Sequence, residues 1–197
     1  MTEQLMDKRV GREVLLELSV ILDVCGIPFY LLHGTALGAY RDNGFVPAEK
    51  DIDLGILYED LHEKVPMLLS ALRKNKFNYE TFVKPFNHPR IIVVSKRNVH
   101  ADLVSLFRWK DYRVDHTPIS TNFEPFCFVH KARLVENYQD VKMFGRTFRI
   151  PSPIEEYLQD EYGPNWRTPT DSFEHFNKVY DFLENEGVPA DWLDQYN

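Results

Sequence analysis

Acidic residues gather at residues 49–53, with the sequence EKDID, shortly after a glycine-containing turn. A carboxylate inside a strand lowers stability unless something compensates its charge. Because side chains alternate between the two faces of a strand, Asp51 and Asp53 point to one face while Ile52 and Leu54 point to the core. Mg²⁺ prefers oxygen ligands and is usually held by one or two carboxylates, water and substrate phosphates. The spacing therefore indicates a magnesium site, with manganese as the alternative ion.

A third acid is expected from a neighbouring strand. Asp102 lies in the sequence Ala-Asp-Leu-Val, within an otherwise apolar segment, and is the best candidate. Two ions about 4 Å apart can steady both the attacking and the leaving oxygen of a phosphoryl displacement. We therefore predict that Asp51, Asp53 and Asp102 are catalytic and bind metal, with two ions in the site. Asp102 either binds the second ion or accepts the proton of an attacking hydroxyl.

The turn before the acids has the features of a phosphate-binding site. Gly34 lets the backbone approach a phosphate closely, and Thr35 can donate a hydroxyl hydrogen bond. The helix start that follows offers free backbone N–H groups and a partial positive charge. Arg41, one or two turns further on, can reach a phosphate oxygen with its guanidinium fork. Gly34, Thr35 and Arg41 are thus predicted to bind substrate.

Each of these signals has a simpler explanation when it is taken alone. Exposed strand faces often carry acids, small-residue turns often serve packing only, and a single strand aspartate such as Asp102 is usually at the surface or in a salt bridge. His33 and His100 are interpreted as structural histidines rather than metal ligands. The order of the parts favours the functional interpretation: a strand, a Gly-Thr turn with a short helix, a D-x-D strand, and a later strand with one acid.

Hydrophobic periodicity and turn signals predict the elements that must position these residues. Helices are expected over residues 5–26, 34–42, 59–75, 152–163 and 172–187, and strands over 29–33, 51–58, 77–85 and 90–107, with a hairpin over 133–151 that turns at Gly145. Ser152 is expected to cap its helix, with Pro153 at the first helical position and Glu155 completing a capping box.

The segment from about 108 to 130 has a poor pattern and is expected to contact the transferred group or its acceptor. Its aromatic side chains look exposed: Trp109, Tyr112, Phe123 and Phe126. In the sequence NWRTP at 165–169, Trp166 is interpreted as a packing residue, with stacking on a base or a choline head as the alternative, and Arg167 is a weaker candidate for substrate binding.

Length and composition indicate one α+β domain over residues 1–197, with a core at about 28–107 and a C-terminal portion of hairpin and helices at about 108–197. The net charge of −7 argues against nucleic acid as a partner. Cys25 and Cys127 are far apart and predicted to be reduced. The start of the chain has no signal-like apolar core, and no run approaches the ~20 apolar residues that span a bilayer. We therefore expect a soluble, cytoplasmic protein with no integral membrane segment.

The order of the parts resembles the nucleotidyltransferase fold of the DNA polymerase β superfamily. The stretch HGTALGAYRDNGFVPAEKDIDLGI at 33–56 is similar to the signature of a narrower group, the LicD family, which includes fukutin-related protein. Downstream, RIIVVSKRNVHADLVSLF at 90–107 and IPSPIEEYLQDEYGPNWRTP at 150–169 resemble the strand pair with the third acid and the closing segment of the family. This likeness covers about residues 28–170 and implies a nucleotidyltransferase-like mixed sheet flanked by helices.

The resemblance also implies an activity. Members of the family move a phosphorylated alcohol, of the phosphocholine or polyol-phosphate kind, from a CDP-linked donor to a sugar or glycan hydroxyl and release CMP. Asp51, Asp53 and Asp102 match the three acids of the family. Glu49 stands where the first acid of a D-x-D-x-D strand falls, so it is a further expected metal ligand. Arg90, on the strand that leads to Asp102, is expected to face the donor.

Some positions depart from the family pattern. His33 stands where many relatives have Gly, and Glu49 replaces the usual Asp. Lys50 lies between acids and is expected to point away from Asp51; a solvated position is favoured over a role in lowering the net charge of the site. Two alternatives stay open: the same fold could move NMP from an NTP to a small molecule or protein and release pyrophosphate, or the chain could be a nucleotide-binding module without activity. The joint presence of the turn and acid residues argues against the latter.

Overall fold

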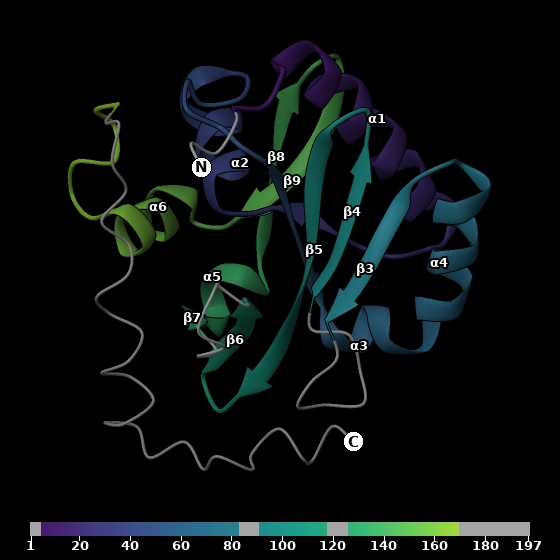
Figure 1. Cartoon of the computed structure of the whole chain (residues 1–197). Helices are drawn as coiled ribbons and strands as arrows, with labels where there is room; N and C mark the ends of the chain where they lie inside the picture. Colours follow the sequence, from purple (N-terminus) through teal and green to yellow (C-terminus); the bar gives the residue numbers. More distant parts are fainter. Residues whose placement is uncertain (1–4, 83–90, 118–125, 170–197) are drawn as a thin grey trace.

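The computed structural model describes residues 5–82, 91–117 and 126–169. Its centre is a seven-stranded mixed sheet with the strand order β1-β2-β5-β4-β3, continued by β6 on β5 and by β7 on β6 (Figure 1). The strands of this sheet are β1 (Tyr30–Leu31), β2 (Ile52–Leu57), β3 (Asn78–Phe82), β4 (Ile91–Lys96), β5 (Val99–Trp109), β6 (Tyr112–Thr117) and β7 (Phe126–Lys131). A separate hairpin pairs β8 (Tyr138–Met143) with β9 (Arg146–Pro151). The mixed sheet confirms the predicted α+β class.

The parallel pairing of β2 with β5 is the part of the sheet that matters most for the site. All other described strand pairs are antiparallel, so this pair needs a long crossover, which β3, β4 and the helices before them provide. On β2, Ile52 and Leu54 are fully buried, as their alternation with acids predicts. Asp53, the acid on β2, therefore lies on the opposite face from Ile52 and Leu54.

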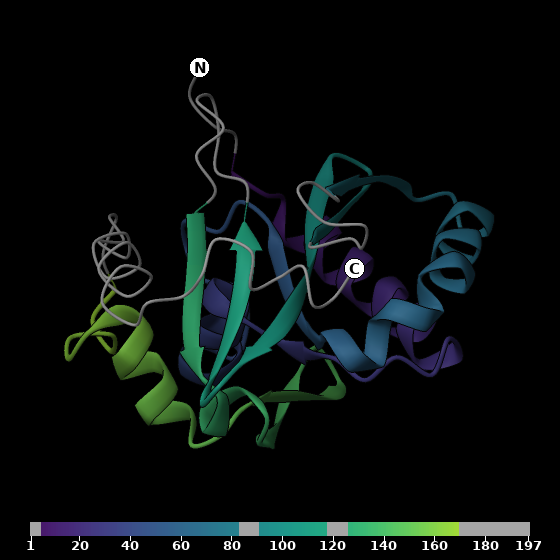
Figure 2. The same ribbon diagram turned by 90° about the horizontal axis from the view of Figure 1, so that it is seen from below.

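Two helices cover one side of the sheet. Helix α1 (Lys8–Val24) contacts α4 (Val65–Lys74) and packs on β5, while α4 packs on β3 (Figures 1 and 2). The Asp7 side chain caps α1 by accepting hydrogen bonds from the first backbone N–H groups, and the helix buries a continuous apolar stripe. Cys25, just after α1, is buried with a free thiol, as predicted, whereas the Cys127 side chain lies outside the described part.

The predicted helix over 59–75 is divided in the structure. It consists of α3 (Tyr58–Leu61), a 3₁₀ turn η2 (His62–Lys64) and α4. Pro66 lies in the first turn of α4, where its missing N–H group has no partner to lose. A proline at this place favours the start of a new helix over the continuation of an old one.

The segment after β1 forms helix α2 (His33–Leu37), followed directly by a π-helical turn η1 (Gly38–Asp42). The predicted short helix over 34–42 is thus confirmed, one residue longer at its start. Gly38 is required for close packing, because a Cβ atom there would lie 2.4 Å from the carbonyl oxygen of Gly44. Asn43 then ends the turn in the left-handed conformation, with φ of 52°.

The C-terminal part begins with β6 and β7, so the poorly patterned segment, which was expected to form short strands or loops, contains an antiparallel strand pair. Residues 133–135, predicted as part of a hairpin, belong instead to the short helix α5 (Ala132–Val135). The hairpin starts later, at β8, and turns at Phe144 and Gly145, both with positive φ. Helix α6 (Ile154–Tyr162) lies at the opposite end of the molecule from α4 (Figure 2).

The predicted cap of α6 is wrong. The helix begins at Ile154, and its N-cap residue is Pro153, in an extended conformation. The N-cap residue makes no side-chain hydrogen bond to the helix. The Ile154 N–H group instead donates to the Gln139 side-chain oxygen, 3.3 Å away, so β8 supplies the partner that Ser152 was expected to provide. The helix expected over 172–187 lies outside the described residues. Within the described ranges, no helix combines the length and apolar character needed to cross a bilayer.

Candidate active site

Strand pairing brings two of the predicted acids side by side. Asp53 on β2 is the register partner of Asp102 on β5, and because these strands run parallel, both side chains leave the sheet on one face. Asp51 lies one residue before β2, in a bend rather than in the strand predicted over 51–58. Its negative charge still acts on Asp53, as does that of Asp102. The three predicted acids therefore form one electrostatic cluster.

Glu49 is the most buried of the predicted acids, with 8% of its surface exposed. Burial and the neighbouring charge of Asp51 raise the pKa of Glu49 from 4.5 to about 8, against the opposing effects of Lys8 and His33. Its Oε2 atom is buried without a hydrogen-bond partner among the described residues. A buried carboxylate oxygen without a donor lowers stability, so this atom is suited to contact a cation.

Burial and neighbouring negative charge also disfavour the ionised form of Asp53. Burial and the charge of Asp51 raise the pKa of Asp53 well above its ordinary value of 3.8, and Asp102 and Glu49 add to this rise while His33 opposes it. Carboxylates this strongly coupled resist simultaneous ionisation unless a cation lies among them. The oxygen-rich donor set of Glu49, Asp51, Asp53 and Asp102 therefore fits the chemistry of Mg²⁺.

Gly34 and Glu49 are in close contact. A Cβ atom at Gly34 would lie 2.8 Å from Oε1 of Glu49 and 3.0 Å from Oε2. Gly34 was predicted to allow the close approach of a phosphate. In the structure, the space beside this glycine holds the Glu49 carboxylate. The turn and the acid cluster are thus directly adjacent.

Thr35 joins the same two parts from the other side. It is fully buried, and its hydroxyl oxygen accepts a hydrogen bond from the backbone N–H of Asp53, 3.0 Å away. The Leu32 N–H group donates to the Asp53 carbonyl at 3.0 Å, so both sides of Asp53 are tied to the start of α2. Thr35 therefore positions Asp53, and its predicted contact with phosphate stays a prediction.

Arg41 points toward the C-terminal part of the chain. Its guanidinium donates two hydrogen bonds to the Asp42 carboxylate, at 2.9 and 2.8 Å, and one to the Trp166 carbonyl at 3.0 Å. Tyr162 lies within electrostatic range of both Arg41 and Asp53. Arg41 is thus held near the acid cluster, and its binding to a donor phosphate stays a prediction.

The remaining predicted residues have different positions. Arg90 and Phe123 lie outside the described residues, as does the side chain of Phe126. Lys50 is exposed, as expected, while Trp109 and Tyr112 are half-buried rather than fully exposed.

Trp166 is buried, which confirms its packing role. Arg167 lies over the Trp166 ring, 4.1 Å from its centroid, and pairs with Glu155.

Sequence reasoning missed a group beside this cluster. Among the described residues, the set of three metal-ligating side chains whose ligand atoms all lie within 4.8 Å of one another is His33, His130 and Glu161, rather than three of the predicted acids. His33 was interpreted as structural, and the other two lie about 100 residues or more further along the chain. Only the departure at His33 from the family pattern pointed to this place. The acids themselves repel one another, which favours wider spacing.

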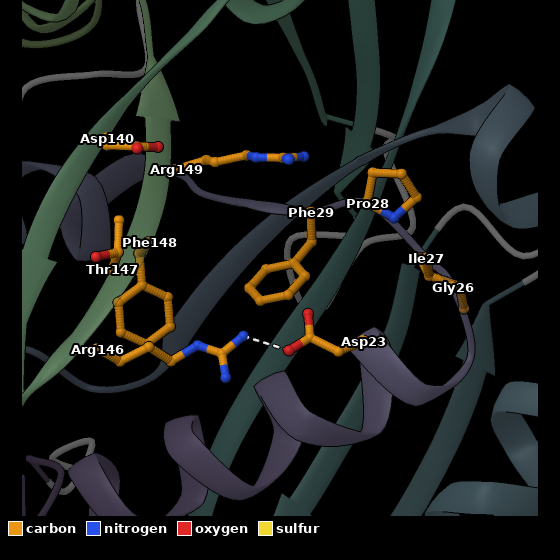
Figure 3. Close-up of a pocket in the computed structure, with 10 residues that line it drawn as sticks. All are labelled: Asp23, Gly26, Ile27, Pro28, Phe29, Asp140, Arg146, Thr147, Phe148 and Arg149. Carbon is orange, nitrogen blue, oxygen red and sulfur yellow. Dashed lines mark hydrogen bonds and ion pairs between the residues drawn. The ribbon is translucent and has the colours of Figure 1, made fainter.

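A pocket of about 520 Å³ lies away from the acids, between β9 and the segment after α1 (Figure 3). Arg146 and Arg149 reach into its surroundings from β9, and Arg146 pairs with Asp23 of α1. The pocket includes none of the predicted site residues. The sequence-predicted site residues are thus not associated with this pocket.

The fold defines a class of protein. The structure is similar to a crystal structure of ANT(2″)-Ia in complex with adenylyl-2″-tobramycin, with a TM-score of 0.50 and 15% identity over 94% of each chain. A solution structure of the antibiotic-resistance factor ANT(2″)-Ia gives a TM-score of 0.52 and 13% identity, over 95% of this chain and 89% of that one. The chain therefore has a nucleotidyltransferase fold, as predicted.

Sequence comparison defines the family within that class. The family described as LicD/FKTN/FKRP, nucleotidyltransferase domain, matches residues 26–153, and the chain belongs to it. Ribitol-5-phosphate transferase FKTN of Mus musculus is 24% identical over 164 residues, covering 82% of this chain and 34% of the relative. The Homo sapiens FKTN is 23% identical over 172 residues, covering 85% and 35%. The chain thus spans about a third of the length of these curated relatives.

Proposed function

We propose that this chain is a magnesium-dependent transferase that moves a phosphorylated alcohol from a CDP-linked donor to a sugar or glycan hydroxyl. The observation that carries the proposal is the cluster of four coupled carboxylates around β2 and β5, within a LicD-family domain. The names of the mouse and human relatives support a polyol phosphate as the class of transferred group.

Glu49, Asp51, Asp53 and Asp102 are the residues that would hold the metal. When bound there, magnesium would supply positive charge to the pyrophosphate of the donor and to the oxygens of the displacement. The buried oxygen of Glu49 and the raised pKa of Asp53 support this assignment, because both are relieved by a cation. Manganese has the same oxygen preference and is the alternative ion.

The residues of the chain would then orient the reaction. The first turn of α2, at Gly34 and Thr35, presents backbone N–H groups to a donor phosphate oxygen. The acceptor hydroxyl oxygen attacks the phosphorus that carries the alcohol, the bond from this phosphorus to CMP breaks, and CMP leaves with the electron pair. Asp102 has one of two roles: it either holds the second ion or accepts the proton of the hydroxyl. Positioning and electrostatics supply most of the rate in such a transfer.

The proposal is tested with the full chain, magnesium and a panel of CDP-ribitol, CDP-glycerol, CDP-choline, CTP and ATP. Thermal shifts report binding, and product analysis reports CMP or pyrophosphate. We expect one CDP-alcohol to raise the melting temperature and to release CMP slowly to water, only with magnesium. The double variant Asp51→Asn/Asp53→Asn should lose both effects. Asp111→Asn, at an exposed turn between β5 and β6, is the matched control and should keep them.

The other outcomes discriminate between the alternatives. Pyrophosphate release from CTP or ATP would replace the proposal with nucleotidyl transfer on the same fold. The absence of binding to every compound, with a folded chain, would favour a module without activity.

A further inference from the structure

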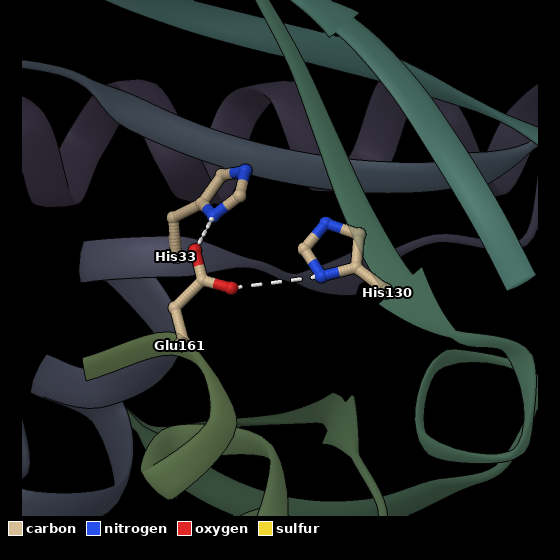
Figure 4. Close-up of side chains that lie close together, drawn as sticks. All are labelled: His33, His130 and Glu161. Atoms are coloured by element: carbon tan, nitrogen blue, oxygen red, sulfur yellow. Dashed lines mark hydrogen bonds and ion pairs between the residues drawn. The ribbon is translucent and has the colours of Figure 1, made fainter. Parts of the chain in front are cut away.

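We propose that His33, His130 and Glu161 form a second metal site, for a zinc-type divalent ion, beside the acid cluster. The three side chains come from the start of α2, the end of β7 and helix α6 (Figure 4). Their potential ligand atoms all lie within 4.8 Å of one another. The site is separate from the predicted magnesium ligands and does not depend on the proposed function.

The donor set favours a transition metal over magnesium. Two imidazole nitrogens and one carboxylate oxygen suit Zn²⁺ and related ions, whereas Mg²⁺ prefers oxygen alone. Two histidines and one glutamate, with water in the fourth position, are a common tetrahedral zinc environment. The acid cluster on β2 and β5 offers carboxylates only, so the two sites would select different ions.

Of the two distances from the histidines to Glu161, one already lies in the range that such an ion needs. Ligands about 2.0–2.2 Å from a tetrahedral ion lie roughly 3.3–3.5 Å apart. Nδ1 of His130 is 3.5 Å from Oε2 of Glu161, within this range. Nδ1 of His33 is 2.7 Å from Oε1 of Glu161, which is a hydrogen-bond distance. Binding requires this pair to give up its shared proton and to separate by roughly 0.6 Å.

The surroundings hold the ligands in place. His130 is 3% exposed, and the Glu161 side chain is 10% exposed, so both are held among packed elements. Tyr157 of α6 accepts a hydrogen bond from the backbone N–H of His33 at 3.1 Å, and its ring packs 5.9 Å from that of His130. Contacts of this kind around the ligands fix their orientation before an ion arrives.

A bound ion would have a specific structural effect. His33 is the first residue of α2, next to Gly34 and Thr35, whereas His130 and Glu161 belong to the C-terminal part. The ion would therefore join the turn of the predicted phosphate site to α6 and β7. It would also place positive charge close to Glu49 and Asp53, both of which already interact electrostatically with His33.

The test uses the Asp51→Asn/Asp53→Asn chain, so that the acid cluster does not compete for the probe. Zn²⁺ is titrated against a coloured chelator, and X-ray absorption of the zinc-loaded protein counts the imidazole ligands. We expect one equivalent of tightly bound zinc with two imidazoles. His130→Ala and Glu161→Gln should each lower the affinity at least about tenfold, and His130→Ala should leave one imidazole.

His100→Ala is the matched control, because His100 is exposed on β5 and lies outside the group. It should leave the zinc affinity and the imidazole count unchanged. Circular dichroism of each variant establishes that it folds. If Glu161→Gln does not fold, Glu161→Asp replaces it, because this variant keeps a carboxylate but shortens the side chain that carries it. Equal zinc affinity in all folded variants, or a zinc shell without imidazole, would overturn the proposal and leave a carboxylate bridged between two histidines. Those outcomes would not affect the proposed function, which is tested with magnesium and nucleotides.

Discussion

At the scale of single residues, the buried side chain of Glu49 makes the stability of the fold depend on pH. Its pKa in the folded chain, about 8, lies above the ordinary 4.5, so the folded state holds this proton more tightly than the unfolded state. The contribution of Glu49 to the free energy of unfolding is therefore full below about pH 4.5 and is lost as the pH rises to about 8.

This sign leads to a prediction for Glu49→Gln, which stays neutral at every pH. Without metal, the variant should differ in stability from the wild type by less than about 1 kcal/mol at pH 5 and be more stable by about 2 kcal/mol or more at pH 9. Urea unfolding in EDTA at pH 5, 7 and 9 measures the difference. Glu80→Gln, at an exposed position on β3, should show no such trend. A constant difference for Glu49→Gln across the pH range would contradict the burial of this charge.

Gly34 gives a second prediction at the same scale. Its missing side chain makes room for the Glu49 carboxylate, so Gly34→Ala should lower stability by about 1–3 kcal/mol. In the Glu49→Ala background the same substitution should cost much less, because the two residues are in contact. A double-mutant cycle by urea unfolding measures this coupling. Gly44→Ala is the control, since the nearest atoms to its Cβ would be 3.9 Å away. Additive effects of the Gly34 and Glu49 changes would show that the contact has no energetic weight.

At the scale of elements, the site depends on how α2 is attached to β2. The hydroxyl oxygen of Thr35 accepts a hydrogen bond from the backbone N–H of Asp53, and Thr35 itself is fully buried. A buried N–H group without an acceptor costs about 1–3 kcal/mol. The short helix and the acid strand therefore act as one unit.

Thr35→Val tests this attachment. It keeps the size of the side chain but removes the acceptor, so we expect a loss of about 1–3 kcal/mol in the free energy of unfolding and weaker magnesium binding. Chemical denaturation and magnesium titration measure the two effects. Thr147→Val, at an exposed position on β9, should change stability by less than about 0.5 kcal/mol. Unchanged stability in Thr35→Val would mean that another group, such as water, satisfies the Asp53 N–H.

Local patterns predicted the elements that carry their own signals. The alternation of acids with Ile52 and Leu54 correctly indicated β2, and the small-residue turn indicated α2. The segment that contains β6 and β7 was expected only as short strands or loops, and on β6 the buried charge of Arg113 at a core position breaks the apolar alternation. The cap of α6 was wrong because Gln139, from a different element, supplies the partner. Local signals do not show such partners.

At the scale of the whole molecule, Arg113 links the core to the C-terminal part. Its side chain is 7% exposed and donates to Glu59 of α3 at 2.8 Å, to Glu136 after α5 at 2.7 Å and to the Leu106 carbonyl at 3.2 Å. Glu59, Arg113 and Glu136 are far apart in the sequence, and no periodic pattern predicts their contact. The same limit explains why the group of His33, His130 and Glu161 was not predicted, since their proximity follows only from the complete fold.

Arg113→Met should therefore destabilise the chain by about 2–3 kcal/mol, because charge-assisted hydrogen bonds are lost and the Glu136 carboxylate is left with fewer donors. Arg133→Met is the matched control: Arg133 also pairs with a glutamate, Glu156, but both side chains are about half exposed. Its loss should cost less than about 1 kcal/mol. Thermal and urea unfolding compare the two variants. Equal effects would show that the Arg113 network does not join the two parts.

The parallel pairing of β2 with β5 also affects how the protein folds. Asp53 and Asp102 become neighbours only after the chain between them has completed its crossover, so local folding of either strand alone creates no cation site. The proposed magnesium binding should appear late in refolding, together with the native sheet, and magnesium would then stabilise the native state selectively by mass action. In a refolding experiment, ion binding would thus report completion of the fold.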